Sequence, residues 1–153
     1  MAKLELRVPP PVVAALAAAA MWLLAFALPP VPVGATARMA AAVAVAVVGG
    51  AFSAAGVLAF RRARTSANPM KPECASSLVT TGVYRITRNP MYVGLLLVLV
   101  AWALFLASPV SLAGPAAFFA YIDRFQIAPE ERALSAMFGS AYAKYMSGVR
   151  RWL

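Results

Sequence analysis

GVYRITRNPMYVG, residues 82–94, leads directly into an apolar run that continues to residue 107. That run is long enough to enter a bilayer. Asn89 and Pro90 suit the N-cap and first position of a membrane helix. Charged groups at the mouth of such a helix are costly without partners, so Arg85 and Arg88 are candidates for a functional role.

The composition of the chain is that of a small helical membrane protein. Apolar residues make up 63% and charged residues 12% of the 153 residues, whereas globular domains have roughly 45–50% and about 25%. The net charge of +9 sits in segments beside apolar runs, which predicts contact with anionic lipid headgroups and argues against a nucleic-acid partner. The chain has no His, and Cys74 is its single Cys, which excludes the usual zinc sites, His-ligated haem and a Ser-His-Asp triad, so we expect no metal.

Four apolar runs predict an all-α, polytopic fold with four transmembrane helices, at residues 11–28, 39–60, 90–107 and 109–122. The fourth run is the shortest, and its extension to Ile127 would lengthen it. Only Ser108-Pro109 separates the last two runs, so they should form a tight helical hairpin. Gly49, Gly50 and Gly56 would allow another helix to approach the second run closely. Residues 25–27 resemble a signal-peptide cleavage site, but we interpret the first run as a membrane helix.

The distribution of basic residues predicts the orientation. With a cytosolic N-terminus, 13 of the 14 Lys and Arg residues lie on the cytosolic side, and Arg38 lies outside. Leu134, Phe138, Tyr142 and Tyr145 recur at helical spacing after Pro129, which predicts a cytosolic amphipathic C-terminal helix. That helix would lie on the membrane or fold back over the cytosolic helix ends. We therefore expect one domain, with two membrane helices in residues 1–60 and the functional core in residues 61–153.

Each polar cluster has a structural and a functional interpretation. Arg85 and Arg88 either follow only the positive-inside rule or, beside a helix N-terminus, form a site for a carboxylate or phosphate. Tyr84 and Tyr92 add ring faces suited to a cation or an adenine ring. Glu130-Glu131 either complement the helix dipole, or one carboxylate accepts two hydrogen bonds from a ribose diol or pairs with Arg85 or Arg88.

Two groups of residues resemble a known superfamily. One comprises residues 82–85 (GVYR) and 88–94 (RNPMYVG). The other comprises Glu130-Glu131 followed by Leu134, Phe138-Gly139, Tyr142, Tyr145 and Arg151-Trp152. Over residues 64–153 the chain is similar to the integral-membrane isoprenylcysteine carboxyl methyltransferase and phospholipid methyltransferase superfamily. Many members have His in place of Asn89, and an amide there can cap a helix but cannot act as a base.

The resemblance implies a methyltransferase that uses S-adenosylmethionine, with its cofactor pocket between the last two membrane helices and the C-terminal helix. The acceptor would be lipophilic and would enter from the bilayer at the cytosolic face. The resemblance assigns catalysis to Arg85 and Glu130, and it assigns cofactor binding to a larger set. That set is Tyr84, Arg85, Arg88, Asn89, Pro90, Tyr92, Gly94, Glu130 and Glu131.

Isoprenylcysteine carboxyl methylation is the expected type of reaction, and the Ala- and Val-rich composition suggests a bacterial inner membrane. Three alternatives remain at this stage. The chain would otherwise be a phospholipid amine N-methyltransferase, a membrane reductase of related architecture, or a non-catalytic membrane subunit.

Overall fold

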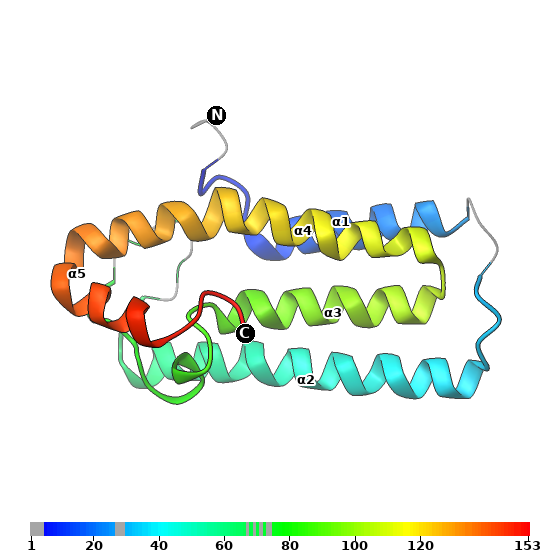
Figure 1. The fold of residues 1–153 in the computed structure, drawn as a ribbon, viewed down its shortest axis with the longest axis horizontal. Coiled ribbons are helices and arrows are strands. Elements are labelled where there is room, and N and C mark those ends of the chain that lie inside the picture. The colour runs from blue at the N-terminus through cyan, green and yellow to red at the C-terminus, as the bar shows by residue number, and fades with distance from the viewer. Residues whose placement is uncertain (1–4, 27–29, 67, 69, 71, 73–74) are drawn as a thin grey trace.

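The computed structural model describes residues 5–26, 30–66, 68, 70, 72 and 75–153, and every regular element within these ranges is helical. The predicted all-α class is therefore confirmed. Helices α1, α2, α3 and α4 lie side by side, and α5 projects beyond one end of this bundle (Figure 1). The elements are α1 (Pro10–Ala25), α2 (Ala35–Arg62), η3 (Gly82–Arg85), α3 (Pro90–Leu106), η4 (Pro109–Leu112), α4 (Ala113–Ile122), η5 (Asp123–Ile127) and α5 (Ala128–Gly148).

The boundaries of α3 follow from local chemistry. Pro90 occupies its first position, where the missing N–H costs nothing because that group would have no partner within the helix. Ala107 ends the helix in the left-handed conformation at φ 50°, and Ser108 is extended. The chain then enters η4 and α4. The tight hairpin expected at Ser108-Pro109 is thus confirmed.

Glycines bring α2 and α3 into close contact. A Cβ atom added to Gly49 would lie 2.7 Å from the carbonyl oxygen of Gly94, and one added to Gly56 would lie 2.8 Å from Cγ of Met91. Both predicted close approaches are therefore confirmed. Gly50 differs, because an added Cβ there would meet nothing within 4 Å.

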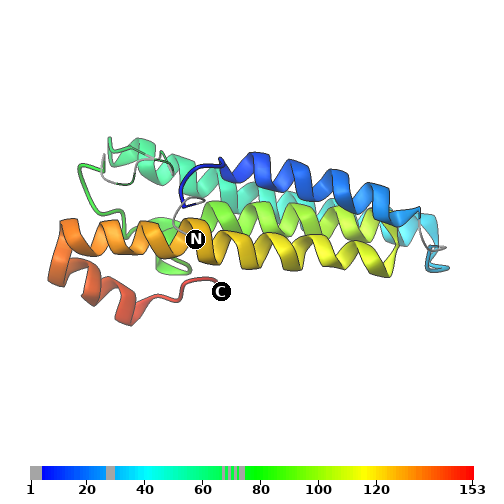
Figure 2. The same ribbon diagram turned by 90° about the horizontal axis from the view of Figure 1, so that it is seen from above.

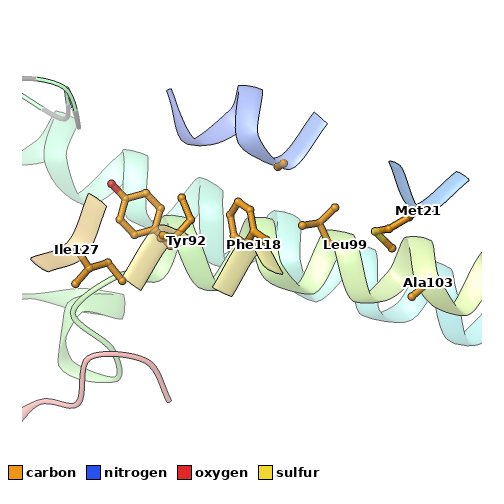
Figure 3. Packing of buried hydrophobic residues seen from close by; sticks show 8 residues of the cluster. Met21, Tyr92, Leu99, Ala103, Phe118 and Ile127 are labelled. Carbon is orange, nitrogen blue, oxygen red and sulfur yellow. The ribbon is translucent and has the colours of Figure 1, made fainter. Parts of the chain in front are cut away.

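The core runs along the length of the bundle. Met21 of α1, Leu99 of α3 and Phe118 of α4 are completely or almost completely buried, and Tyr92 and Ile127 extend the same cluster toward the end that carries α5 (Figure 3). Burial of large apolar side chains of this kind stabilises each by roughly 1.5–3 kcal/mol. This packing holds the starts of α3 and α5 next to each other.

The predicted break between a fourth span and a C-terminal helix beginning at Pro129 is wrong. Helix α4 continues through the π-helix η5 directly into α5, with helical backbone angles at Ile127 and Ala128. Pro129 has no N–H to donate to the carbonyl of Phe125, four residues earlier. The N–H of Leu6 donates to that carbonyl instead, at 3.1 Å, so an N-terminal residue replaces the missing helical bond.

The C-terminal helix also reverses direction. Gly139 has φ 48° and ψ −121°, a conformation that glycine adopts far more readily than other residues, and it interrupts α5. The second half of α5 then folds back alongside the first (Figure 2). The single amphipathic helix predicted from Leu134 to Tyr145 is therefore two short segments that face each other.

One helix of the described chain, α2, is both long and apolar enough to cross a membrane, with 28 residues and a mean hydropathy of 2.2 over its best 18-residue window. Only 11% of that window is buried against the rest of the protein. Helices α1 and α3 are apolar but shorter, at 16 and 17 residues.

Candidate functional site

A cavity lies at the end of the bundle that carries α5. It has a volume of about 790 Å³ including its open mouth. The start of α3, both halves of α5, η3 and parts of the segment between residues 66 and 79 form its walls. The cavity therefore brings together the two polar clusters that lie about 40 residues apart in the chain. The predicted residues that line it are Tyr84, Arg88, Asn89, Tyr92, Glu130 and Glu131.

The residues just before α3 hold the C-terminal segment. Thr87 is completely buried, and its hydroxyl donates to the carbonyl of Arg151 at 3.2 Å and accepts from the N–H of Asn89 at 3.1 Å. Asn89 occupies the N-cap position as predicted, but its side chain does not cap the helix. Its amide donates instead to the carbonyl of Arg151 at 2.9 Å. Both side chains thus fix the C-terminal segment beside the cavity.

Arg88 is the arginine that the structure places in the cavity wall. Its Nη2 donates to Oε1 of Glu131 at 2.7 Å, and its Nη1 donates to the carbonyls of Met146 and Val149 at 3.1 Å each. Its Nε is buried and has no hydrogen-bond partner among the described residues. Arg88 is therefore well oriented and retains one unused donor.

Glu131 forms an ion pair, which decides between the two interpretations of this residue. Its side chain is 15% exposed and contacts Arg88, exposed to 12%, and Arg151. Arg151 donates from Nη2 to Oε2 of Glu131 at 2.5 Å and from Nε to Oε1 at 3.1 Å. Charge-assisted pairs with two parallel bonds are among the stronger polar contacts in proteins. Glu131 thus does more than complement the helix dipole.

Asp123 completes this network from the π-helix. Its carboxylate accepts from Nη1 of Arg151 at 3.1 and 3.2 Å and from the indole N–H of Trp152 at 3.1 Å. The hydrogen bond with Glu131, with a further contribution from Asp123, raises the pKa of Arg151. Asp123 and Thr87 are site residues that the sequence does not predict, because no local motif marks either of them.

Glu130 is the carboxylate that faces the cavity without a cationic partner among the described residues. The Tyr92 hydroxyl donates to its Oε1 at 2.5 Å. Burial raises the pKa of Glu130 to about 8, with the negative charge of Glu131 contributing, while the Tyr92 hydrogen bond acts in the opposite direction. A carboxyl group that titrates near neutral pH can accept or release a proton under physiological conditions.

Three further tyrosines surround the cavity. The Tyr145 hydroxyl donates to the carbonyl of Tyr84 at 2.7 Å, which links the second half of α5 to η3. Tyr142 is 2% exposed, and burial raises its pKa to about 12. Burial also raises the pKa of Tyr84. All three rings are therefore neutral at physiological pH and offer apolar faces. The structure places both Tyr142 and Tyr145 in the cavity wall.

Comparison with known proteins decides the family of this chain. Residues 37–141 match a family model described as phospholipid methyltransferase. The chain belongs to the phospholipid methyltransferase family. It is also similar to an uncharacterised protein of Haemophilus influenzae, with 46% identity over 63 residues that cover 41% of this chain and all of that protein. No solved structure matches the chain.

The family match spans most of the cavity. It includes Arg88, Asn89, Glu130 and Glu131 and ends just before Tyr142 in the chain. Members of this family are membrane-associated methyltransferases, so membership confirms the superfamily suggested by the sequence motifs. Arg151, which fixes Glu131, lies beyond the matched residues.

Three predicted site residues lie elsewhere. Arg85 is exposed on η3 and does not line the cavity. Pro90 is buried at the start of α3, and Gly94 is buried where α3 crosses α2, with its α-carbon facing Ser53 and Gly49. Glycine at residue 94 therefore serves helix packing in this structure. Lys71 and Cys74 lie outside the described residues.

Proposed function

We propose that this protein transfers a methyl group from S-adenosylmethionine to a lipophilic acceptor at the cytosolic face of a membrane. Membership of a methyltransferase family supports the type of reaction. The observation that carries the proposal is the cavity, which combines an oriented arginine, a carboxylate without a cationic partner and several neutral aromatic rings. No His is required for such a reaction.

The residues of the cavity fit the proposed cofactor. S-adenosylmethionine supplies an activated methyl group and carries a carboxylate, a ribose diol and an adenine ring. Two buried donors in the cavity wall, Nε of Arg88 and the hydroxyl of Ser77, have no partner among the described residues. Buried polar groups are costly when unpaired, so they favour a polar ligand. Arg88 would hold the carboxylate, and Glu130 has a second oxygen available to accept from the diol.

Positioning is the main task that this proposal gives to the protein. Methyl transfer is faster when the bound acceptor is held in line with the methyl group, because the two reactants no longer have to meet and orient in solution. Exclusion of water also protects the reacting groups. Phe60, Leu78 and Leu134 give the cavity an apolar lining that suits both tasks. Arg85 was predicted to be catalytic, and its exposed position leaves that role as a prediction to be tested.

Two acceptor classes follow from the superfamily. A prenylated cysteine carboxylate is the first, as in isoprenylcysteine carboxyl methyltransferases. The amine of a phospholipid is the second, and the family description favours it. An amine must lose a proton when it is methylated, and Glu130, with a pKa of about 8, is suited to accept that proton.

We further propose that α1, α2, α3 and α4 all cross the membrane, with the cavity on the cytosolic side of a bacterial inner membrane. Large apolar side chains are exposed on the outside of the bundle, including Leu16, Trp22, Val47 and Phe105. Contiguous exposed apolar surface is unusual in a soluble monomer and suits contact with lipid. The direction of the helices fits this topology, because the end of α2 and the starts of α1 and α3 lie toward the end of the bundle that carries α5 (Figure 1).

Calorimetry of the detergent-purified protein tests this function. We expect S-adenosylmethionine and S-adenosylhomocysteine to bind, and Arg88→Ala to weaken both. Arg85→Ala is the matched control, because it removes a nearby exposed arginine that does not line the cavity. Binding of a nicotinamide cofactor instead would indicate a membrane reductase, and binding of neither would indicate a non-catalytic membrane subunit. Transfer of a labelled methyl group from S-adenosylmethionine to phospholipid or to a prenylcysteine would then identify the acceptor.

A further inference from the structure

The carboxylate of Glu131 is shared unequally between two arginines. Arg151 contacts both of its oxygens, through Nη2 to Oε2 at 2.5 Å and through Nε to Oε1 at 3.1 Å. Arg88 contacts only Oε1, through Nη2 at 2.7 Å. The two-point contact therefore belongs to the arginine that does not line the cavity.

The unequal sharing matters because of the shape of a guanidinium group. Nε and Nη2 of an arginine donate from the same edge, and a carboxylate normally takes both donors at once. On Arg88, Nη2 is bonded to Glu131, whereas the adjacent Nε is buried without a partner among the described residues. If Glu131 had no other contact, its second oxygen would be the natural acceptor for that Nε.

Arg151 is itself fixed from two further directions. Its Nη1 donates to both oxygens of Asp123, and its backbone carbonyl accepts from Thr87 and Asn89. Trp152, the next residue, also donates to Asp123 and packs on Phe119 with ring centres 4.6 Å apart. These contacts restrict the orientation in which Arg151 holds the carboxylate.

We propose that Arg151 is a positioning residue that keeps Glu131 off Nε of Arg88 and so leaves this buried donor unpaired, for an anionic group of the bound ligand. The inference rests on the proposed function, in which that group is the carboxylate of S-adenosylmethionine. Arg151 would then control affinity without touching the ligand. Its role depends on the fork of the guanidinium and not only on its charge.

Three substitutions separate geometry from charge. Arg151→Ala releases Glu131, which then closes on Arg88, and Arg151→Lys keeps the charge but cannot hold both oxygens in a fixed plane. We expect each to raise the Kd for S-adenosylmethionine about tenfold, the effect of one lost charge-assisted hydrogen bond. Arg150→Ala is the matched control, because it removes a neighbouring exposed arginine. Within the described residues only the backbone carbonyl of Arg150 forms a hydrogen bond, which it accepts from the N–H of Arg88. This variant should bind like the wild type.

A second-site change tests the sharing directly. Glu131→Gln in the Arg151→Ala background removes the second acceptor oxygen, so Nε of Arg88 stays unpaired. The affinity for S-adenosylmethionine that Arg151→Ala loses should then be largely restored. A merely structural role for Arg151 predicts a further loss instead. Wild-type affinity in Arg151→Lys, or a double variant that binds no better than Arg151→Ala, would overturn the inference.

A measurement without ligand keeps this inference separate from the proposed function. In ¹⁵N-labelled protein, the Nε–H signal of Arg88, assigned by its loss in Arg88→Lys, should shift downfield and exchange more slowly with water in Arg151→Ala. The cause would be the new bond to Glu131. If the wild-type protein binds no S-adenosylmethionine but this shift occurs, the proposed function fails and the positioning role stands. An unchanged Arg88 signal would overturn the positioning role itself.

Discussion

Replacement of Tyr92 by Phe would remove one hydrogen bond to Glu130 and little else. The Tyr92 hydroxyl donates to Oε1 of Glu130 at 2.5 Å, while its ring belongs to the buried core between the helices. Phe keeps the ring, so the packing of α3 should survive. Glu130 would lose the one hydrogen-bond donor that the described residues give its carboxylate.

The size and sign of the effect follow from that contact. A hydrogen bond to a charged group contributes roughly 1.5–3 kcal/mol, and one pKa unit corresponds to about 1.36 kcal/mol. The hydroxyl stabilises the ionised form, so its removal should raise the pKa of Glu130 above its value of about 8, by about one to two units. At pH 8 the carboxyl group of the variant would then be largely protonated.

Titration of ¹³C-labelled glutamate by NMR measures this shift, with Glu130→Gln to assign the signal. Tyr142→Phe is the matched control, because Tyr142 is also buried in the cavity wall but makes no hydrogen bond through its hydroxyl to a described residue. That variant should leave the pKa within a few tenths of a unit. An unchanged or lowered pKa in Tyr92→Phe would refute the inference that this hydroxyl stabilises the Glu130 carboxylate.

Four further outcomes are expected. Arg88→Ala should raise the Kd for S-adenosylmethionine about ten- to a hundredfold in calorimetry, while Arg85→Ala changes it less than about threefold; equal effects would contradict the assignment of the anion site to Arg88. The pKa of Glu130 is raised in the folded state from 4.5 to about 8, so between these pH values the folded protein binds one more proton at Glu130 than the unfolded chain. The melting temperature should therefore fall as the pH rises from 4.5 to about 8, and Glu130→Gln should weaken this pH dependence. Gly94→Ala should cost about 1–3 kcal/mol of unfolding free energy, because its Cβ would overlap Gly49 and Ser53, whereas Gly50→Ala should be tolerated; equal melting temperatures would argue against the close helix crossing. In a Cys74→Ser background, cysteines placed at residues 38 and 64 should be labelled from opposite sides of the membrane, and labelling from one side would contradict the proposed topology.

Much of the helical framework could be predicted from the sequence. Apolar runs bounded by proline mark α1 and α3, and the short Ser108-Pro109 connection predicts the hairpin that the structure contains. The sequence also indicates a pairing between the two polar clusters, with Arg85 or Arg88 as the partner of one of the two glutamates. Only the fold selects Arg88, because it places Arg88 against Glu131 and leaves Arg85 exposed on η3.

The C-terminal half was harder to predict for physical reasons. Pro129 is typical of a helix start, but the N–H of Leu6 takes the carbonyl that Pro129 leaves unpaired, so the helix continues without a break. Helical spacing on both sides of Gly139 looks like one amphipathic face, although the chain reverses there. The contact between Asp123 and Arg151 depends on that reversal, and no local sequence pattern predicts the reversal.

The unbroken passage from α4 into α5 makes the cavity a space between two long rigid arms. One arm carries Glu130 and Glu131, and the other, α3, begins next to Arg88; the two are joined at Ser108, at the far end of the bundle. Helix α3 has 17 residues and a rise of about 1.5 Å for each, so its length is roughly 26 Å. A change of about 5° in the angle at that joint would move the two walls by about 2 Å relative to each other. In the membrane-spanning arrangement proposed above, a change in bilayer thickness that tilts these helices would thereby change the width of the cavity.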